Sequence, residues 1–175
     1  MNNQWEGIKL TTVLKKNEKY RGLTFHQYYL LLPGSPVVCH YVVVEQRSPE
    51  IFLFKDWYMD GFFKPDQRMS NSWLETVNEA GRSLKVHGGK GEVELDATKG
   101  FTIGSDTKPD ILQIVTDQDD AALGTYVNKQ VIQISVGRKI NLAPRDIVSL
   151  PPVFFVFNEK AFPIDTLKDL ASIRF

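Results

Sequence analysis

The sequence predicts a single α+β domain, with about eight strands in mostly antiparallel sheets and two or three helices. The first observation behind this prediction is composition: 175 residues, 42% of them hydrophobic and 24% charged, suit one globular domain with a buried core. The second is that short apolar runs separated by turn residues recur along residues 1–175, with no linker, repeat or low-complexity tract. The third is that helix signals are few, which favours hairpin-linked strands over regular βαβ winding.

The clearest element is a central hairpin whose two apolar arms are separated by the turn Pro33–Pro36. Proline presets φ for the first corner of a turn, and glycine supplies the positive φ of the second. The second arm, Val37–Val44, is apolar almost throughout and rich in β-branched residues. We therefore expect a strand covered on both faces, with one or more of Val38, Tyr41 and Val42 deeply buried.

The remaining strands are predicted from short runs of apolar, β-branched and aromatic residues bounded by turn formers. With the hairpin, the predicted strands are Ile8–Leu14, Phe25–Leu32, Val37–Glu45, Ile51–Phe54, Gly91–Leu95, Ile111–Thr116, Val131–Val136 and Val153–Phe157. The stretch Asp120–Lys129 is ambiguous, because it begins like a helix while Gly124 and Tyr126–Val127 suit a turn that enters the next strand.

Two segments carry helix signals. In Ser72–Val86, Ser72 and Glu75 form a capping-box pattern, and Gly88 and Gly89 follow as a stop signal. The apolar stripe of this predicted helix consists of Trp73, Val77, Ala80 and Leu84. A short C-terminal helix is predicted after Pro163, with Asp165 as its N-cap and with Leu167, Leu170 and Ala171 facing inward.

Charge and cysteine content restrict the partners and the compartment. Lys+Arg and Asp+Glu both number 21, so the chain lacks the basic excess that nucleic-acid binders usually carry. The single cysteine, Cys39, cannot form an intramolecular disulfide, which favours a reducing compartment. The N-terminal sequence lacks a signal-peptide pattern, and the apolar runs are too short to span a bilayer. We expect a soluble cytoplasmic protein, or one assembled into a particle made in the cytoplasm, without a membrane partner.

No motif indicates a cofactor, a metal or a catalytic residue. The glycines of His87–Gly91 follow a predicted helix, whereas a phosphate-binding loop opens one. The aspartates around Asp117 lack the glycine and glutamate that an EF-hand calcium loop requires. Cys39 and His40 are adjacent on a predicted strand, so their side chains point to opposite faces and do not form a nucleophile–base pair.

The segment Lys55–Arg68 is the strongest candidate for recognition. It places large aromatics and a methionine among charged residues, and Gly61 and Pro65 break it. Aromatic residues mixed with Met and Arg are typical of interface hot spots, although large aromatics also often fold back into a core. The predicted interface residues are Trp57, Tyr58, Met59, Phe62, Phe63 and Arg68.

A second candidate lies in Lys15–Tyr29, where basic residues flank several aromatics. Such a mixture can cradle a single nucleic-acid strand through phosphate contacts and base stacking, and it also suits a solvated basic turn. The candidate nucleic-acid contacts are Lys15, Lys16, Lys19, Tyr20 and Arg21.

Three classes of function follow from these patterns. We expect first a non-enzymatic structural or interaction subunit of a homo- or hetero-oligomeric assembly, such as a viral particle or another multi-subunit machine. The first alternative is a single-stranded nucleic-acid-binding protein. The second alternative is a small enzyme whose site is assembled from distant residues.

Overall fold

The computed structural model describes residues 5–16, 18–77, 82–97, 100–117, 122–173 and 175, and within these ranges the side chains of 53–59, 96–97, 122, 138–139 and 168 are not described. The described strands are β1 (Glu6–Val13), β2 (Leu23–Leu31), β3 (Val37–Gln46), β4 (Phe52–Phe63), β5 (Ser72–Val77), β6 (Ser83–His87), β7 (Val93–Ala97), β8 (Phe101–Ser105), β9 (Ile111–Thr116), β10 (Ala122–Val127), β11 (Ile132–Leu142), β12 (Ile147–Ser149) and β13 (Val153–Asn158). The described helical segments are two 3₁₀ turns, Met69–Asn71 and Ile164–Leu167, and the helix α1 (Lys168–Ala171).

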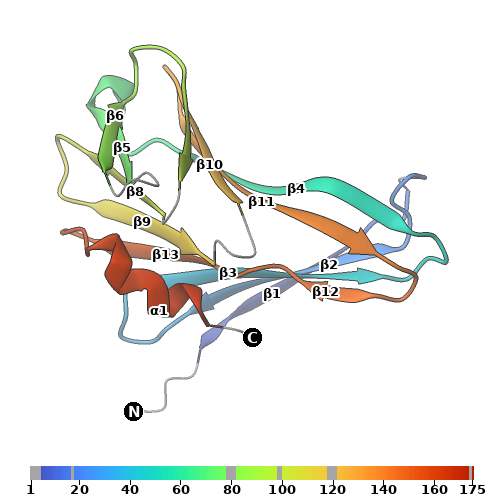
Figure 1. The fold of residues 1–175 in the computed structure, drawn as a ribbon. Coiled ribbons are helices and arrows are strands. Elements are labelled where there is room, and N and C mark those ends of the chain that lie inside the picture. The colour runs from blue at the N-terminus through green and yellow to red at the C-terminus, as the bar shows by residue number, and fades with distance from the viewer. Residues whose placement is uncertain (1–4, 17, 78–81, 98–99, 118–121, 174) are drawn as a thin grey trace.

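The strands form two antiparallel sheets packed face to face (Figure 1). The large sheet has nine strands in the order β1-β2-β3-β13-β9-β8-β5-β6, with β12 paired to β3. The small sheet has four strands in the order β4-β11-β10-β7. The protein is therefore a β-sandwich, and the predicted α+β class with two or three helices is wrong. Apart from Met69–Asn71, the helical structure of the described residues is confined to Ile164–Ala171.

The predicted helix Ser72–Val86 is instead the pair of strands β5 and β6, which lie antiparallel with Trp73 opposite His87. The Ser72 hydroxyl does not cap a helix but accepts a hydrogen bond from the backbone N–H of Asp66 at 3.2 Å. Side chains at Leu74 and Thr76 alternate into the core, and β5 also pairs with β8 on its other side. Long-range pairing thus overrides a helical pattern that local spacing alone supports. Of the predicted stripe, Ala80 lies outside the described residues.

The central hairpin is confirmed as β2 and β3, and Gly34 adopts the expected positive φ of 74° in the turn. Tyr41 and Val42 are buried, whereas Val38 is half-buried. The two faces of β3 are covered by different parts of the molecule. Cys39 and Tyr41 pack under the C-terminal segment, and Val42 and Val44 pack under the small sheet.

The other predicted strands are present, with several boundaries moved. The strand predicted at Ile51–Phe54 continues to Phe63 as β4, and the ambiguous stretch Asp120–Lys129 contains β10. The short strands β8 and β12 were not predicted, because Phe101–Ser105 mixes Thr, Gly and Ser with only two large apolar residues. The C-terminal helix is confirmed after Pro163, with Leu167 buried, but Asp165 lies within the 3₁₀ turn Ile164–Leu167 and is not its N-cap.

The buried side chains form three clusters. One lies between the small sheet and the strands β5, β8, β9 and β13, and a second lies between the ends of β2–β3 and of β4–β11. The third lies on the outer face of the large sheet, where the segment Ile164–Ile173 covers Phe154 and Cys39. The two sheets are therefore packed together at both ends of the sandwich. No helix among the described residues is long and apolar enough to cross a membrane.

Candidate functional site: a cavity between the two sheets

A cavity of about 410 Å³ lies between the two clusters that join the sheets. The large sheet contributes side chains from β1, β2, β3, β9 and β13, and the small sheet contributes the wall formed by β4 and β11. The lining residues are Thr12, Phe25, Gln27, Tyr29, His40, Val42, Ile114, Val153 and Phe155 on the large sheet, and Asp60, Gly61, Phe63, Ile134 and Val136 on the small sheet.

Strand alternation explains which residues of the large sheet reach the cavity. Successive side chains of a strand point to opposite faces, so Phe25, Gln27 and Tyr29 share one face of β2. The register of the hairpin places Tyr29 directly opposite His40 and Gln27 directly opposite Val42. Residues that face each other in an antiparallel pair lie on the same face, so this set converges on one side of the sheet.

A stacked pair of rings lines the cavity, and one of them, Tyr29, is 36% exposed. The rings of Tyr29 and His40 lie 4.6 Å apart between centroids and are inclined by 11°. The Tyr29 hydroxyl donates a hydrogen bond to Gln27 Oε1 at 3.1 Å. The Nε2 atom of His40 is buried and has no hydrogen-bond partner among the described residues. An unpaired buried polar atom of this kind is rare in native proteins and calls for a ligand or another explanation.

Burial also determines the charge of His40. Desolvation lowers the pKa of its imidazole below the ordinary value, because the charged form is disfavoured away from water. At neutral pH the ring is therefore uncharged, with one nitrogen that donates and one that accepts a hydrogen bond.

The wall from the small sheet is mostly apolar. Gly61 faces Ile134 across the β4–β11 pair, and an added Cβ at Gly61 would lie 2.8 Å from Phe63 Cε2, so the Phe63 ring packs over the glycine where a side chain would stand. Asp60 borders the cavity, but its side chain alternates with Gly61 and lies with Ser135 toward the other face, where the Ser135 hydroxyl donates a hydrogen bond to Asp60 Oδ1 at 2.6 Å.

The lining carries three titratable side chains, Tyr29, His40 and Asp60. The Asp60 carboxylate accepts a hydrogen bond from Ser135, and the Tyr29 hydroxyl donates one to Gln27. The described residues also contain no group of three His, Cys, Asp or Glu placed to hold a metal ion.

The predicted interface residues separate in the structure. Trp57, Tyr58 and Met59 belong to β4, but their side chains lie outside the described residues. Phe62 is 65% exposed on the outer face of the small sheet, whereas Phe63 is half-buried and lines the cavity. A sixth residue, the exposed Arg68, precedes the turn Met69–Asn71. A shared interface for this set stays a prediction.

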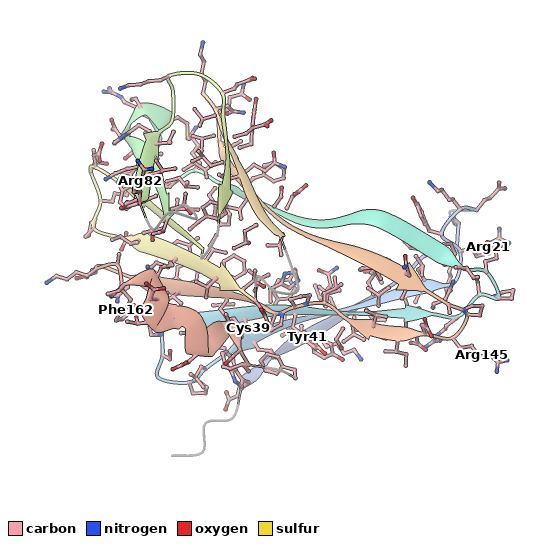
Figure 2. The ribbon with its side chains drawn as sticks, in the orientation of Figure 1. Arg21, Cys39, Tyr41, Arg82, Arg145 and Phe162 are labelled. Atoms are coloured by element: carbon pink, nitrogen blue, oxygen red, sulfur yellow. The ribbon has the colours of Figure 1, made fainter. Side chains whose placement is uncertain are left out.

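The predicted nucleic-acid contacts lie in the connection between β1 and β2, at the end of the sandwich where Figure 2 also shows Arg145. Tyr20 is half-buried, with its ring centroid 6.3 Å from that of Phe52 and the Lys19 Nζ atom 5.0 Å from its ring. The remaining candidates are exposed: Lys15, Lys16, Lys19 and Arg21. Nucleic-acid binding by this turn stays a prediction.

His40 and Tyr29 were not predicted as site residues from the sequence. The predicted placement of Cys39 and His40 on opposite faces of one strand is confirmed. The pairing of Tyr29 with His40 could have been predicted, because it follows from counting outward on both sides of the turn Pro33–Pro36. The wall of the cavity that the small sheet forms could not have been predicted, since no local pattern indicates that β4 and β11 lie above this part of the hairpin.

The sequence matches no family model, and no curated protein is similar to it, but solved structures share its fold. A TPR-domain containing protein from Parabacteroides distasonis superposes with a TM-score of 0.63 at 11% identity, over 95% of this chain and 37% of that one. The alpha-galactosidase from Lactobacillus brevis gives 0.63 at 10% identity, over 90% of this chain and 23% of that one. A putative aldose 1-epimerase from Escherichia coli K12 superposes with a TM-score of 0.58 at 10% identity, over 89% of this chain and 68% of that one. The chain thus spans 23% to 68% of these proteins, and it shares their sandwich fold.

Proposed function

We propose that this domain binds a neutral saccharide unit in the cavity between its sheets. The observation that carries the proposal is the His40 imidazole, which stacks on the Tyr29 ring and whose buried Nε2 has no hydrogen-bond partner among the described residues, in the lining of a cavity of about 410 Å³. Small-molecule sites are concave and mostly apolar, with a few placed polar groups and volumes upward of about 300 Å³. The cavity has these properties, and its volume accommodates a single sugar ring.

The chemistry of the lining supports an uncharged hydroxylated ligand. A sugar ring has apolar C–H faces that pack on aromatic and aliphatic side chains, and its hydroxyls both donate and accept hydrogen bonds. His40, Gln27 and Thr12 offer polar partners beside the apolar surfaces of Phe25 and Val136. Two of the proteins that share the fold, an alpha-galactosidase and a putative aldose 1-epimerase, bear names of sugar chemistry, which is consistent with the proposal.

The experiment is a titration of the protein with the methyl glycosides of glucose and galactose, followed by saturation-transfer NMR and calorimetry. We expect binding by the wild type and its loss in His40→Leu, because the substitution removes the imidazole nitrogens that the described lining offers to a ligand. The matched control is His87→Gln, since His87 lies on β6, where its Nε2 is 3.0 Å from Asp106 Oδ2. The proposal fails if neither glycoside binds the wild type, or if His40→Leu binds as well as His87→Gln.

A second candidate function is the protein contact predicted from Lys55–Arg68. The observation that favours it is Phe62, a large aromatic that is 65% exposed on β4, an edge strand of the small sheet. Exposed edges and apolar side chains are common sites of association. A Phe62→Ser variant should then lower the oligomeric mass measured by light scattering without changing the melting temperature. We also propose a cytoplasmic location, because a chain with a single cysteine forms no internal disulfide and suits a reducing compartment.

A further inference from the structure

The face of the large sheet that forms the cavity continues beyond it into an exposed apolar surface. Ile8, Leu10 and Leu31, which we call the apolar shelf, are 60%, 50% and 53% exposed. They lie on β1, the edge strand of the large sheet, and on its neighbour β2. Exposed apolar side chains are ordinary when they are scattered, but three that adjoin one another beside a cavity indicate a binding surface.

The register joins the shelf to the cavity. Ile8 lies directly opposite Tyr29, and Leu10 lies directly opposite Gln27. Side chains at such positions share a face and have Cβ atoms about 5 Å apart. Tyr29 and Gln27 both line the cavity, as does Thr12 two residues beyond Leu10. The shelf therefore runs beside the cavity along β1 and reaches past Tyr29 to Leu31 on β2.

We propose that the cavity and the shelf together bind an amphiphile, with a saccharide head beside His40 and an uncharged linear hydrocarbon chain along the shelf. This inference rests on the proposed function, because it assigns the head of the ligand to the same cavity.

The size of the shelf favours a hydrocarbon chain over a protein surface. From Leu10 to Glu6 the strand advances about 13 Å, at about 3.3 Å per residue, which is comparable to a medium-length alkyl chain. Three partly exposed side chains offer at most a few hundred Å². A stable protein interface buries roughly 800 Å² on each partner.

The charges around the shelf favour an uncharged chain. Glu6 lies opposite Leu31 at the far end of the shelf, where its carboxylate would repel a chain that carried a negative charge at that end. Lys9 belongs to the other face of β1, where its Nζ atom lies 5.3 Å from the centroid of the Tyr28 ring, so it does not offer the shelf a cation. The chain of an alkyl glycoside carries no charge and needs no cation.

The test is calorimetric titration with methyl, hexyl and octyl β-D-glucopyranoside, each below its micelle concentration. Burying one methylene strengthens binding up to about fourfold, from about 0.8 kcal/mol. We expect the octyl glucoside to bind at least tenfold more tightly than the methyl glucoside. In the Ile8→Ser/Leu10→Ser double variant, and separately in Leu31→Ser, the octyl advantage should fall at least threefold while methyl glucoside binding is unchanged. The matched control is Leu84→Ser, a 39% exposed leucine on β6, which should keep the full chain-length dependence.

The outcomes separate this inference from the proposed function. Equal affinities for methyl and octyl glucoside would overturn the shelf and leave saccharide binding intact. Binding of octanol as tight as that of octyl glucoside, without binding of methyl glucoside, would overturn the saccharide head and the proposed function with it. A ligand-free dimer in light scattering that the double variant dissociates would show a second copy of the chain on the shelf, and would overturn the inference.

Discussion

Two adjacent residues of β3, Cys39 and His40, show how far a local rule reaches. Strand alternation predicts that their side chains diverge, and they do: Cys39 packs under the C-terminal segment, and His40 lines the cavity. Burial raises the pKa of the Cys39 thiol to about 12, so the thiol is protonated and unreactive at neutral pH. The same rule could not show that the face carrying His40 would border a cavity.

We expect His40→Leu to leave the free energy of unfolding unchanged or to raise it at pH 7.5, although it abolishes ligand binding. The substitution puts an apolar side chain in place of a buried polar atom that has no partner among the described residues, which removes a desolvation cost. Urea denaturation of the wild type and the variant measures the difference. A loss of more than about 2 kcal/mol would show that the imidazole makes a stabilising interaction, because losses of that size need a specific mechanism.

His40 should also make the free energy of unfolding depend on pH. The pKa of its imidazole is lower in the folded state than the ordinary value of 6.5, so at pH values below 6.5 the unfolded chain binds more protons. Wild-type stability should therefore decline as the pH falls below 6.5 toward the folded-state pKa, and the full contribution should be present above 6.5. The decline between pH 7 and pH 5 should be smaller in His40→Leu than in His87→Gln. Equal slopes would contradict a buried neutral imidazole.

At the scale of elements, the segment Ser72–Val86 shows where local spacing misleads. A capping-box pattern and an apolar stripe predict a helix, yet β5 pairs with both β6 and β8. The segment does contribute to the core, as predicted, but with the period of a strand and not of a helix, because the alternate residues Ser72, Leu74 and Thr76 are buried. The hairpin β2–β3 was predictable since a distinctive turn sets its register. No turn signal of that kind specifies the pairing of β5 with the distant β8.

The β5–β8 pair depends on a glycine. Trp73 lies directly opposite Gly104, and a Cβ added at Gly104 would lie 2.4 Å from Trp73 Cζ2. The Lys85 Nζ atom sits 3.9 Å from the centroid of the indole, so the ring is held from the other side too. Gly104→Ala should lower the free energy of unfolding by roughly 1–3 kcal/mol through overpacking.

The matched control for this change is Gly124→Ala on β10. An added Cβ there meets no atom within 4 Å, so the substitution should be neutral or stabilise by up to about 1 kcal/mol. Urea denaturation of both variants checks the pair. If Gly104→Ala is as stable as Gly124→Ala, the indole does not rest on the glycine.

The connection from β4 to β5 is fastened to the end of β8 through Asp66. The Asp66 carboxylate accepts hydrogen bonds from the Arg68 backbone N–H at 2.8 Å, from the Ser105 hydroxyl at 3.1 Å and from the Thr107 hydroxyl. These bonds, chiefly that of Thr107, lower the pKa of Asp66 to about 2. Its stabilising effect should be complete above pH 4 and should be lost as the pH falls toward 2, because the unfolded carboxyl takes up its proton first.

We expect Asp66→Asn to lower the urea midpoint at pH 7, because an amide carries two N–H donors into a site where donors already converge. The variant should also lose less stability than the wild type between pH 4 and pH 2. The control is Asp60→Asn, whose side chain keeps an oxygen for the Ser135 hydroxyl on the outer face of the small sheet. Parallel acid profiles for the wild type and Asp66→Asn would contradict the low pKa.

At the scale of the molecule, two packed ends and an open middle define the sandwich. Composition and strand pattern predict one domain of antiparallel strands, and most of the strands are found where they are expected. The division of those strands between two sheets was not predictable, because it depends on contacts between residues far apart in the chain. Leu23 with Ile140, and Phe101 with Ile132, share buried clusters at the two ends. The cavity exists because these clusters do not meet.

An unfilled cavity lowers the free energy of unfolding, and a ligand that binds in it would explain why it is kept. Val136→Phe tests whether filling the cavity gains stability and loses binding. Val136 is buried, lines the cavity from β11 and faces room for a larger ring. Filling the cavity should raise the free energy of unfolding by about 1 kcal/mol, because more apolar surface leaves water, and it should abolish saccharide binding. The matched control, Val44→Phe, places the same ring in the fully packed cluster beneath β3 and should cost roughly 1–3 kcal/mol. Thermal and urea denaturation with a parallel glycoside titration measures both properties. A Val136→Phe variant as destabilised as Val44→Phe would show that side chains of the protein already fill the cavity. That result would contradict the proposal that the cavity is a binding site.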